Sequence, residues 1–235
     1  MEYKAIKITE ITEKINRFYD KAYGKKHVLH NLKHLEWQFR DNPYYKEGGF
    51  SLIIIEDEYE VRAHLGFIPI QLTILGENIS ALWHLSFYTL EGFRGKKLGT
   101  KMIELSNAYG DLSMVLSGSE GTKKIYSNIG GKDLGLLNRH IQILNKNNIE
   151  KYGDIKIKIK SVSIKNNNIG KFERVIKIHN KYEKFWSNVK NRFPITVNRS
   201  KEYLNWRYLD HPMIDYHFME FTVDDNLRGF AVIRF

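Results

Sequence analysis

The chain of 235 residues contains no cysteine, which excludes disulfide bonds, zinc sites with thiolate ligands and an acyl-enzyme formed on cysteine. No apolar run approaches the length of about 18 residues that indicates a membrane-spanning helix. The N-terminal stretch, MEYKAIKITEITEKI, lacks the apolar core of a signal peptide. These absences predict a cytoplasmic protein that does not insert into a membrane.

Apolar and basic side chains are plentiful. Apolar residues make up 42% of the sequence and aromatic residues 13%, enough to fill the core of one large domain or two small ones. The 37 Lys and Arg residues outnumber the 27 Asp and Glu residues, which gives a formal net charge of +10. This charge favours anionic partners such as phosphates, nucleic acid or acidic membranes without choosing among them.

Hydrophobic spacing predicts two helices and three strands in the first part of the chain. Residues 10–23 carry apolar side chains at helical intervals, and a second helix is predicted over 26–40. The segment FSLIIIED (50–57) is predicted to be a strand, with 61–74 as its hairpin partner. The third strand is predicted over 79–90, and its alternation would place Trp83, Leu85 and Phe87 on one face and His84, Ser86 and Tyr88 on the other.

A crossover connection is predicted after the third strand. A helix should run from Leu98 to about Tyr109, with Met102, Ile103 and Leu105 on its buried side. A short strand over 112–117 should follow. A strand, a helix and a further strand make a βαβ unit, so this part of the sheet is expected to be parallel. A second short helix, over 119–131, would end at glycines.

One pattern occurs twice in the chain. The stretch LEWQFRDNP (35–43) returns as LNWRYLDHP (204–212), and a strand-like segment with a Gly-Phe pair follows each copy. The interval is the size of a domain, which suggests a duplicated domain, and chance is the alternative because Trp and Pro often stand at helix ends. The second copy would stop at Phe235 before any counterpart of 91–102, as in a fragment or a half-domain.

The stretch EGFRGKKLGTKM (91–102) sets a basic, glycine-containing loop against the predicted start of a helix. The first turn of a helix offers unpaired N–H groups and a partial positive charge, which bind phosphate. Gly95 and Gly99 would let the backbone approach a ligand closely. The loop therefore predicts a pyrophosphate site, although it matches neither the Walker A pattern nor G-x-G-x-x-G.

The loop resembles the acyl-CoA pyrophosphate loop of the GNAT superfamily of N-acetyltransferases, Q/R-x-x-G-x-G/A. Arg94 stands at its first position and Gly99 at its last, whereas Lys97 replaces the middle glycine. The segment KKIYSNIGG is similar to the final helix signature of the family, in which a Tyr precedes a Gly by four residues, here Tyr126 and Gly130. The resemblance covers about residues 1 to 131.

The resemblance implies an α/β fold with a GNAT-like mixed sheet and flanking helices, followed by a partial second GNAT-like unit. The implied domains are an acyl-CoA-binding domain over 1–145 and a partial repeat domain over 146–235. The implied activity is direct transfer of an acetyl or other acyl group from acetyl-CoA to an amine. The acceptor would be a small molecule, with an amino sugar as one possibility.

The resemblance also implies roles for individual residues. Tyr126 would be the general acid that protonates the departing thiolate. The backbone of the strand before the loop, at Tyr88 and Thr89, would pair with pantetheine. The expected cofactor-binding residues of the loop are Arg94, Gly95, Lys96, Lys97, Leu98, Gly99 and Thr100.

His84 is a candidate general base, because an unperturbed histidine pKa of about 6.5 suits proton transfer at neutral pH. A histidine that is only hydrogen-bonded in place is the alternative. Glu91, at the end of the same strand, is a second candidate, although a carboxylate at a strand end is usually solvated.

Two other groups of residues are interpreted as parts of the fold and not as binding sites. His27, His30 and His34 could share one helix face, but no carboxylate stands in register, so no metal site is predicted. The aromatic and basic segment 179–195 could bind nucleic acid, yet the spacing of its apolar residues from Ile176 onward favours a helix that faces the core.

Two alternatives to acyl-CoA-dependent transfer remain open at this point. Tandem GNAT-like folds also occur in aminoacyl-tRNA-dependent transferases, and a basic chain could hold tRNA. A non-catalytic descendant is the other alternative, because Lys97 departs from the loop pattern and the second copy is incomplete.

Overall fold

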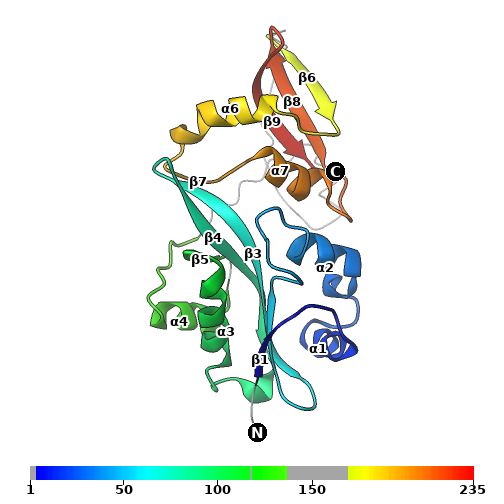
Figure 1. The fold of residues 1–235 in the computed structure, drawn as a ribbon, viewed down its shortest axis with the longest axis vertical. Coiled ribbons are helices and arrows are strands. Elements are labelled where there is room, and N and C mark those ends of the chain that lie inside the picture. The colour runs from blue at the N-terminus through cyan, green and yellow to red at the C-terminus, as the bar shows by residue number, and fades with distance from the viewer. Residues whose placement is uncertain (1–3, 117, 137–168) are drawn as a thin grey trace, which may run out of the picture.

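The computed structural model describes residues 4–116, 118–136 and 169–235. Its elements form a larger sheet with helices on both faces and a smaller three-stranded sheet (Figure 1). The larger group contains β1 (Lys4–Lys7), α1 (Glu13–Tyr23), α2 (Leu32–Phe39), β2 (Leu52–Glu56), β3 (Val61–Ile74), β4 (Glu77–Thr89), α3 (Leu98–Ser106), β5 (Leu112–Val115) and α4 (Glu120–Asn128). The smaller group contains β6 (Lys171–Val175), α6 (Lys181–Val189), β7 (Ile195–Val197), α7 (Lys201–Leu204), a π-helical turn (Asn205–Leu209), β8 (His217–Val223) and β9 (Asn226–Ile233).

The larger sheet has the strand order β1-β2-β3-β4-β5. Its pairs are antiparallel except for β4 and β5, which are parallel and are connected through α3. The predicted crossover is therefore confirmed. The bounds of β3 are those of the predicted hairpin partner, 61–74.

Helices cover both faces of this sheet, with α1 and α2 on one face and α3 and α4 on the other (Figure 1). On the first face, Phe18 and Phe39 pack against Leu52. On the second face, Met102 and Ile103 from α3 pack in one cluster with strand residues that include Phe67 and Leu82. Burial on both faces explains why β2 is an almost continuous apolar run.

The smaller sheet has the order β6-β8-β9, with antiparallel pairs throughout. This is the order and direction of β1, β2 and β3 in the larger sheet, and helices lie between the first and second strands in both. A duplicated unit would give this arrangement. The predicted domain boundary, between 145 and 146, lies outside the described residues.

The two copies of the repeated pattern meet at their tryptophans. The indole nitrogen of Trp37 donates to the carbonyl oxygen of Trp206 at 2.7 Å, and that of Trp206 donates to the carbonyl oxygen of Trp37 at 2.7 Å. The two rings are buried and stack with centroids 5.3 Å apart. Each tryptophan thus donates one hydrogen bond to the other and accepts one from it. Contacts across a two-fold symmetry axis show the same reciprocal pattern.

A second link joins the smaller group to the larger sheet. β7 pairs with the end of β3, where Leu72 is opposite Val197 and Ile74 is opposite Ile195. The backbone N–H of Leu75 also donates to the carbonyl oxygen of Pro194 at 2.8 Å. The long hairpin of β3 and β4 therefore belongs to the larger sheet at one end and carries a strand of the smaller group at the other.

The prediction of one helix over 26–40 was wrong. A 3₁₀ turn (Val28–His30) is separated from α2 by Asn31, whose side chain accepts from the N–H of His34 at 3.1 Å. An Asn that caps a helix has non-helical backbone angles, so it ends one element and begins the next.

The predicted alternation along β4 was also wrong. Ser86 has a φ of 50°, and the register between β3 and β4 shifts beside it. A bulge adds one residue to a strand and reverses the faces of those that follow. His84 therefore faces α3, while Tyr88 packs with the cluster beneath α1.

Two predicted core positions are exposed. Leu105 of α3 is exposed, and Ser106 is buried in its place. Ile176 lies before α6 and is exposed, although Tyr182 and Trp186 of that helix are buried as predicted. Ser106 follows Met102 by four residues and therefore lies on the buried stripe of α3, whereas Ile176 precedes the first residue of α6.

The turn into α3 uses a left-handed residue that is not glycine. Lys97, the residue before α3, has a φ of 58° and a ψ of 16°. This conformation costs an L-residue about 1–2 kcal/mol, and glycine adopts it freely. The turn into α3 is therefore made at some cost in stability, which a glycine at this position would avoid.

We predict that Trp37→Phe and Trp206→Phe are each destabilising and are coupled. Each substitution leaves a buried carbonyl without its donor, which costs about 1–3 kcal/mol. Because the residues touch, the double variant should depart from additivity by about 0.5–3 kcal/mol in urea unfolding. Trp37→Phe with Trp186→Phe, whose indole bonds Asn198, is the control and should be additive. Additive effects at 37 and 206 would contradict the coupling.

We predict that Lys97→Gly raises the free energy of unfolding, by up to about 1 kcal/mol, because it relieves the left-handed backbone. Lys101→Gly, inside α3, should lower it by about 1 kcal/mol. Urea unfolding of both variants checks the opposite signs. A loss of stability in both would show that Lys97 carries no strain.

Candidate functional site

The loop between β4 and α3 is folded as a compact turn. A 3₁₀ turn (Glu91–Phe93) follows β4, and the N–H of Arg94 donates to the carbonyl oxygen of Glu91 at 3.2 Å. Gly95 follows with a φ of 81°, and Lys97 then leads into α3. The turn therefore aims the first N–H groups of α3 back toward the loop.

The first turn of α3 has no acidic residue, and no side chain caps it. By contrast, Thr12 caps α1 and Ser119 caps α4, and both of these helices have an acid in the first turn. The N–H groups that begin a helix have no partner within it, and the helix dipole is positive there. Arg94, Lys96, Lys97 and Lys101 stand around this end and are exposed. Uncapped N–H groups and four cations suit a pyrophosphate.

Gly99 is required by close packing. A Cβ at this position would lie 2.7 Å from Cζ of Phe87 and 3.1 Å from Cδ1 of Ile125. The glycine therefore lets α3 approach β4 and α4. This is a different reason from the one the sequence suggested, which was close approach to a ligand.

β4 and β5 pair over a short stretch only, and the unpaired stretch beyond it is called the opening between them. The parallel pairing covers only Ala81 to His84 on β4 and Leu112 to Val115 on β5. β4 continues to Thr89, and its last part is paired with β3 alone among the described residues. Beyond His84, β4 therefore has no strand partner on the side of β5 among the described residues, as pairing with a pantetheine amide would require.

Tyr126 and His84, the two predicted catalytic residues, meet where this opening begins. The hydroxyl oxygen of Tyr126 lies 2.5 Å from Nδ1 of His84. The other ring nitrogen, Nε2, lies 3.0 Å from Oγ of Ser106. The sequence analysis did not single out Ser106, although it follows Met102 by four residues and Ile103 by three and therefore lies on the apolar stripe of α3.

Burial sets the proton affinities of this pair. His84 is 1% exposed, and burial lowers its pKa to about 4. Burial also raises the pKa of Tyr126 above its usual value. The expectation of an unperturbed histidine pKa was wrong, because the imidazole is neutral at pH 7 and both of its nitrogens are engaged. Tyr126 is a protonated phenol at the same pH.

The bulge of β4 is held from the other face of the sheet. The carbonyl oxygen of Ser86 accepts from the hydroxyl of Tyr23 at 2.9 Å and from Nδ1 of His64 at 2.8 Å. His64 must donate through Nδ1, so Nε2 accepts from the hydroxyl of Tyr19 at 3.2 Å. Burial lowers the pKa of His64 to about 4, which keeps this arrangement neutral.

The remaining predicted site residues lie at the end of β4. The guanidinium of Arg94 lies 5.7 Å from the ring centroid of Tyr88, and Nε of Arg94 donates to the carbonyl oxygen of Thr89 at 3.3 Å. This bond fixes the exit of β4 to the loop. Glu91 is exposed in the 3₁₀ turn that follows.

The three N-terminal histidines do not share a helix face. His27 precedes the 3₁₀ turn and stacks on Tyr23, with ring centroids 4.7 Å apart. His30 lies 3.3 Å from a carboxylate oxygen of Asp20, and His34 packs beside Trp37. The described residues contain no group of three or more His, Cys, Asp or Glu that could hold a metal ion.

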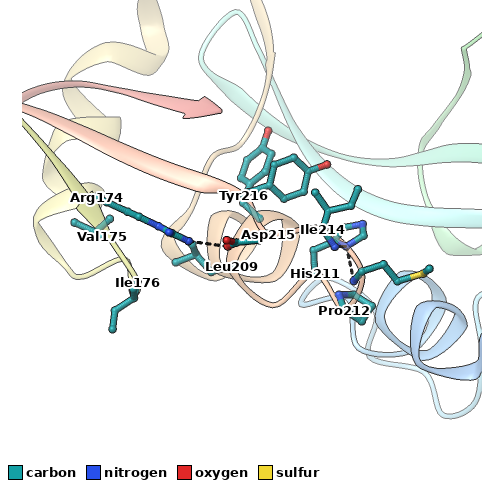
Figure 2. A pocket seen from close by; sticks show the side chains of 11 residues that line it. Arg174, Val175, Ile176, Leu209, His211, Pro212, Ile214, Asp215 and Tyr216 are labelled. Atoms are coloured by element: carbon teal, nitrogen blue, oxygen red, sulfur yellow. Dashed lines mark hydrogen bonds and ion pairs between the residues drawn. The ribbon is translucent and has the colours of Figure 1, made fainter. Parts of the chain in front are cut away.

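A hollow of about 390 Å³ lies on the smaller group (Figure 2), and its lining residue His211 packs against Trp37, with ring centroids 4.1 Å apart. Three of its polar side chains, those of Arg174, Asp215 and His211, bond to other groups of the protein. Arg174 donates to Asp215 at 2.7 Å, and Nδ1 of His211 accepts from the N–H groups of Met213 and Ile214. This hollow has no evident place in the chemistry of the loop.

No helix in the described ranges is long and apolar enough to pass through a bilayer. No family model and no curated protein matches the sequence. Similarity is found among solved structures.

A probable N-acyltransferase from Enterococcus faecalis V583 has a TM-score of 0.60 and 11% identity, over 100% of this chain and 56% of that one. Two structures of Saccharomyces cerevisiae N-myristoyltransferase with bound myristoyl-CoA have TM-scores of 0.55 and 0.54 at 12% identity. They align with 98% of this chain, which spans 57% and 59% of theirs. The chain therefore shares the fold of these structures, the GNAT-like fold that the resemblance of its sequence predicts.

Proposed function

We propose that this protein transfers an acyl group from acyl-CoA to the amine of a small molecule. One observation carries the proposal: the uncapped, basic first turn of α3 adjoins the opening between β4 and β5, and Tyr126 lies where that opening begins. The structural neighbours described above include N-myristoyltransferase with myristoyl-CoA. The proposed acyl donor is acetyl-CoA. An acyl-CoA with a longer acyl chain is the alternative donor.

The loop would hold the pyrophosphate of CoA. The N–H groups of Leu98, Gly99 and Thr100 begin α3 and would donate to its oxygens. Arg94 and Lys97 would add positive charge beside them. Because Arg94 also binds the carbonyl oxygen of Thr89, the pyrophosphate site and the end of β4 would be fixed relative to each other.

The end of β4 would hold the rest of the donor. Beyond His84 it has no strand partner on the side of β5 among the described residues, so its free backbone groups near Tyr88 and Thr89 could pair with pantetheine amides, although the carbonyl oxygen of Thr89 already accepts from Arg94. The thioester would then lie near Tyr126. Attack by a neutral amine and loss of the thiolate need an acid near the sulfur, and Tyr126 is the protonated group there.

His84 does not suit the role of base for the amine. Its pKa is lowered to about 4 by burial, and its two nitrogens face Tyr126 and Ser106. The amine would therefore arrive already neutral or lose its proton to water. The rate should then rise with pH toward the pKa of the acceptor amine itself.

Lys97 does not argue for a non-catalytic protein. Lys97 adopts a left-handed conformation that glycine also adopts, and its backbone N–H remains part of the loop. A lysine there also adds charge beside the proposed phosphates. The departure from the family pattern thus changes the side chain and keeps the backbone path.

We predict that acetyl-CoA raises the thermal midpoint of unfolding of the protein. At one hundred times its dissociation constant, a ligand stabilises by about 2.7 kcal/mol. Arg94→Ala and Lys97→Glu should weaken this response, because both remove positive charge from the loop. Lys184→Glu, on the exposed side of α6, changes charge as Lys97→Glu does and should respond like the native protein. Differential scanning fluorimetry at two salt concentrations measures all four proteins.

The same titration separates the alternatives. No shift at high acetyl-CoA, together with RNA binding that weakens steeply with salt, would support the tRNA-dependent alternative instead. A shift without acyl transfer to any of a panel of amines, including amino sugars, would support a non-catalytic protein. A shift that Lys184→Glu loses as fully as Lys97→Glu would place the donor away from the loop.

A further inference from the structure

A buried arginine contacts the segment that leads into the proposed pyrophosphate loop. Arg62, the second residue of β3, is 7% exposed, and its guanidinium carbon lies 4.2 Å from the ring centroid of Phe93. Phe93 ends the 3₁₀ turn after β4, and Arg94 follows it directly. Nζ of Lys96, within the loop, lies 4.8 Å from the same centroid. The ring therefore joins the loop to β3.

Two carboxylates hold this guanidinium. Nε of Arg62 donates to Oδ2 of Asp57 at 2.6 Å, and Nη1 pairs with a carboxylate oxygen of Glu60. Asp57 is itself fixed, because its Oδ1 accepts from the backbone N–H groups of Tyr59 and Glu60. The hydrogen bond from Arg62 lowers the pKa of Asp57, so both members of the pair are charged at pH 7. The turn between β2 and β3 thus sets the orientation of the guanidinium.

Helix α1 anchors the same turn. Nζ of Lys14 donates to the carbonyl oxygen of Asp57 at 2.7 Å and lies 3.0 Å from a carboxylate oxygen of Glu56. Lys21 pairs with Glu60. With the guanidinium, these pairs contain three cations and three carboxylates. They carry no net charge together, so they do not attract a phosphate from a distance, and what they supply is placement.

The backbone of β3 holds the other end of the 3₁₀ turn. The N–H of Leu90 donates to the carbonyl oxygen of Arg62 at 2.9 Å, and the N–H of Phe93 donates to the carbonyl oxygen of Leu90 at 2.9 Å. Arg62 therefore fixes Leu90 through its main chain and Phe93 through its side chain. With both residues held, the direction in which Arg94 leaves the turn is determined.

Orientation explains a buried arginine at this place better than stability does. A buried ion pair contributes little to stability, because the cost of removing two charges from water offsets much of their attraction. A cation is attracted to the face of an aromatic ring, whose edge is positive, so it fixes how the ring lies. An aliphatic side chain has no such preference, since hydrophobic burial is not directional.

We propose that Arg62 is a positioning residue for the pyrophosphate loop. Its guanidinium fixes the ring of Phe93, and the ring fixes the 3₁₀ turn from which Arg94 and the first N–H groups of α3 reach the phosphates. The proposal rests on the acyl-CoA binding proposed above. Arg62 acts through Phe93 and does not itself touch the donor.

Phe93→Leu tests the contact, because it keeps an apolar side chain and removes the ring. It should raise the Kd of acetyl-CoA about tenfold, equivalent to about 1.4 kcal/mol, within the range of a desolvated cation–π contact. The KM for acetyl-CoA should rise similarly with kcat changed less than about twofold, since the pyrophosphate does not react. Phe93→Tyr keeps the ring and should bind as the native protein does. Native affinity of Phe93→Leu in isothermal titration calorimetry would overturn the proposal.

Salt separates placement from charge. Arg94→Ala removes an exposed cation, so its loss of affinity should become smaller as salt screens the charges. Phe93→Leu removes no charge, so its loss of affinity should be the same at low and high salt. A loss in Phe93→Leu that disappears at high salt would assign the effect to long-range attraction and would contradict positioning.

Tyr109→Leu is the matched control. Tyr109 is half-buried in the 3₁₀ turn (Asn107–Tyr109) at the other end of α3, and Nζ of Lys7 lies 5.5 Å from its ring centroid. The substitution removes a ring beside a cation, as Phe93→Leu does, and should leave the Kd of acetyl-CoA unchanged. An equal loss of affinity would show a general effect on the packing of α3 and would refute the assignment to the loop.

Arg62 is tested together with Asp57. Arg62→Gln alone leaves a buried carboxylate without its cation, which destabilises the fold. Arg62→Gln combined with Asp57→Asn removes both charges and keeps two side chains that can hydrogen-bond to each other. This double variant should raise the Kd of acetyl-CoA as much as Phe93→Leu does, and Phe93→Leu should add nothing in its background. Additive losses would show that ring and guanidinium act independently, against the proposal.

Amide hydrogen exchange measured by NMR needs no ligand, so it separates this proposal from the proposed function. The N–H of Arg94 donates to the carbonyl oxygen of Glu91, and its exchange should be about tenfold faster in Phe93→Leu and unchanged in Tyr109→Leu. If acetyl-CoA does not bind the native protein, the proposed function fails, and the exchange decides alone whether Arg62 positions the loop. If acetyl-CoA binds and Phe93→Leu has native exchange and affinity, the function stands and the positioning fails.

Discussion

The bulge of β4 at Ser86 is the constraint on which the arrangement of the site depends. Without the extra residue, His84 and Tyr88 would lie on one face of the sheet. With it, His84 faces α3 and α4, where it meets Tyr126, while Tyr88 faces α1. The sheet thereby separates a face for proton chemistry from a face for packing. Two donors, Tyr23 and His64, hold the bulge carbonyl in place.

Hydrophobic periodicity in the sequence predicted the helices and strands in which one pattern of apolar residues continues without interruption. The bounds of β3 followed from its place as the hairpin partner of the apolar run 50–57, and the crossover followed from a strand, an apolar helix and a further strand. It could not predict the bulge, because a serine at positive φ has no sequence signature and is held by partners more than twenty residues away. Asn31 was overlooked because the apolar spacing continues across it.

The candidate site was predictable to the same extent. The loop and Tyr126 came from a resemblance, and the structure brings Tyr126 and His84 together. The pKa of His84 could not be predicted, because it depends on burial that only the packing of α3 against β4 creates. Ser106 could have been found from the sequence, because it follows Met102 by four residues and so lies on the apolar stripe of α3, where a buried hydroxyl needs a hydrogen-bond partner.

The contact between the two tryptophans links the site to the smaller group. Trp37 belongs to α2, which packs on the same face as α1, and α1 carries the Tyr23 that holds the bulge. Trp206 belongs to the copy in the smaller group. The smaller group also supplies β7 to the far end of β3, the strand on which His64 lies. It therefore braces the helix layer and the strand that hold the bulge. The smaller group can therefore affect the geometry of the site without containing any residue that reacts.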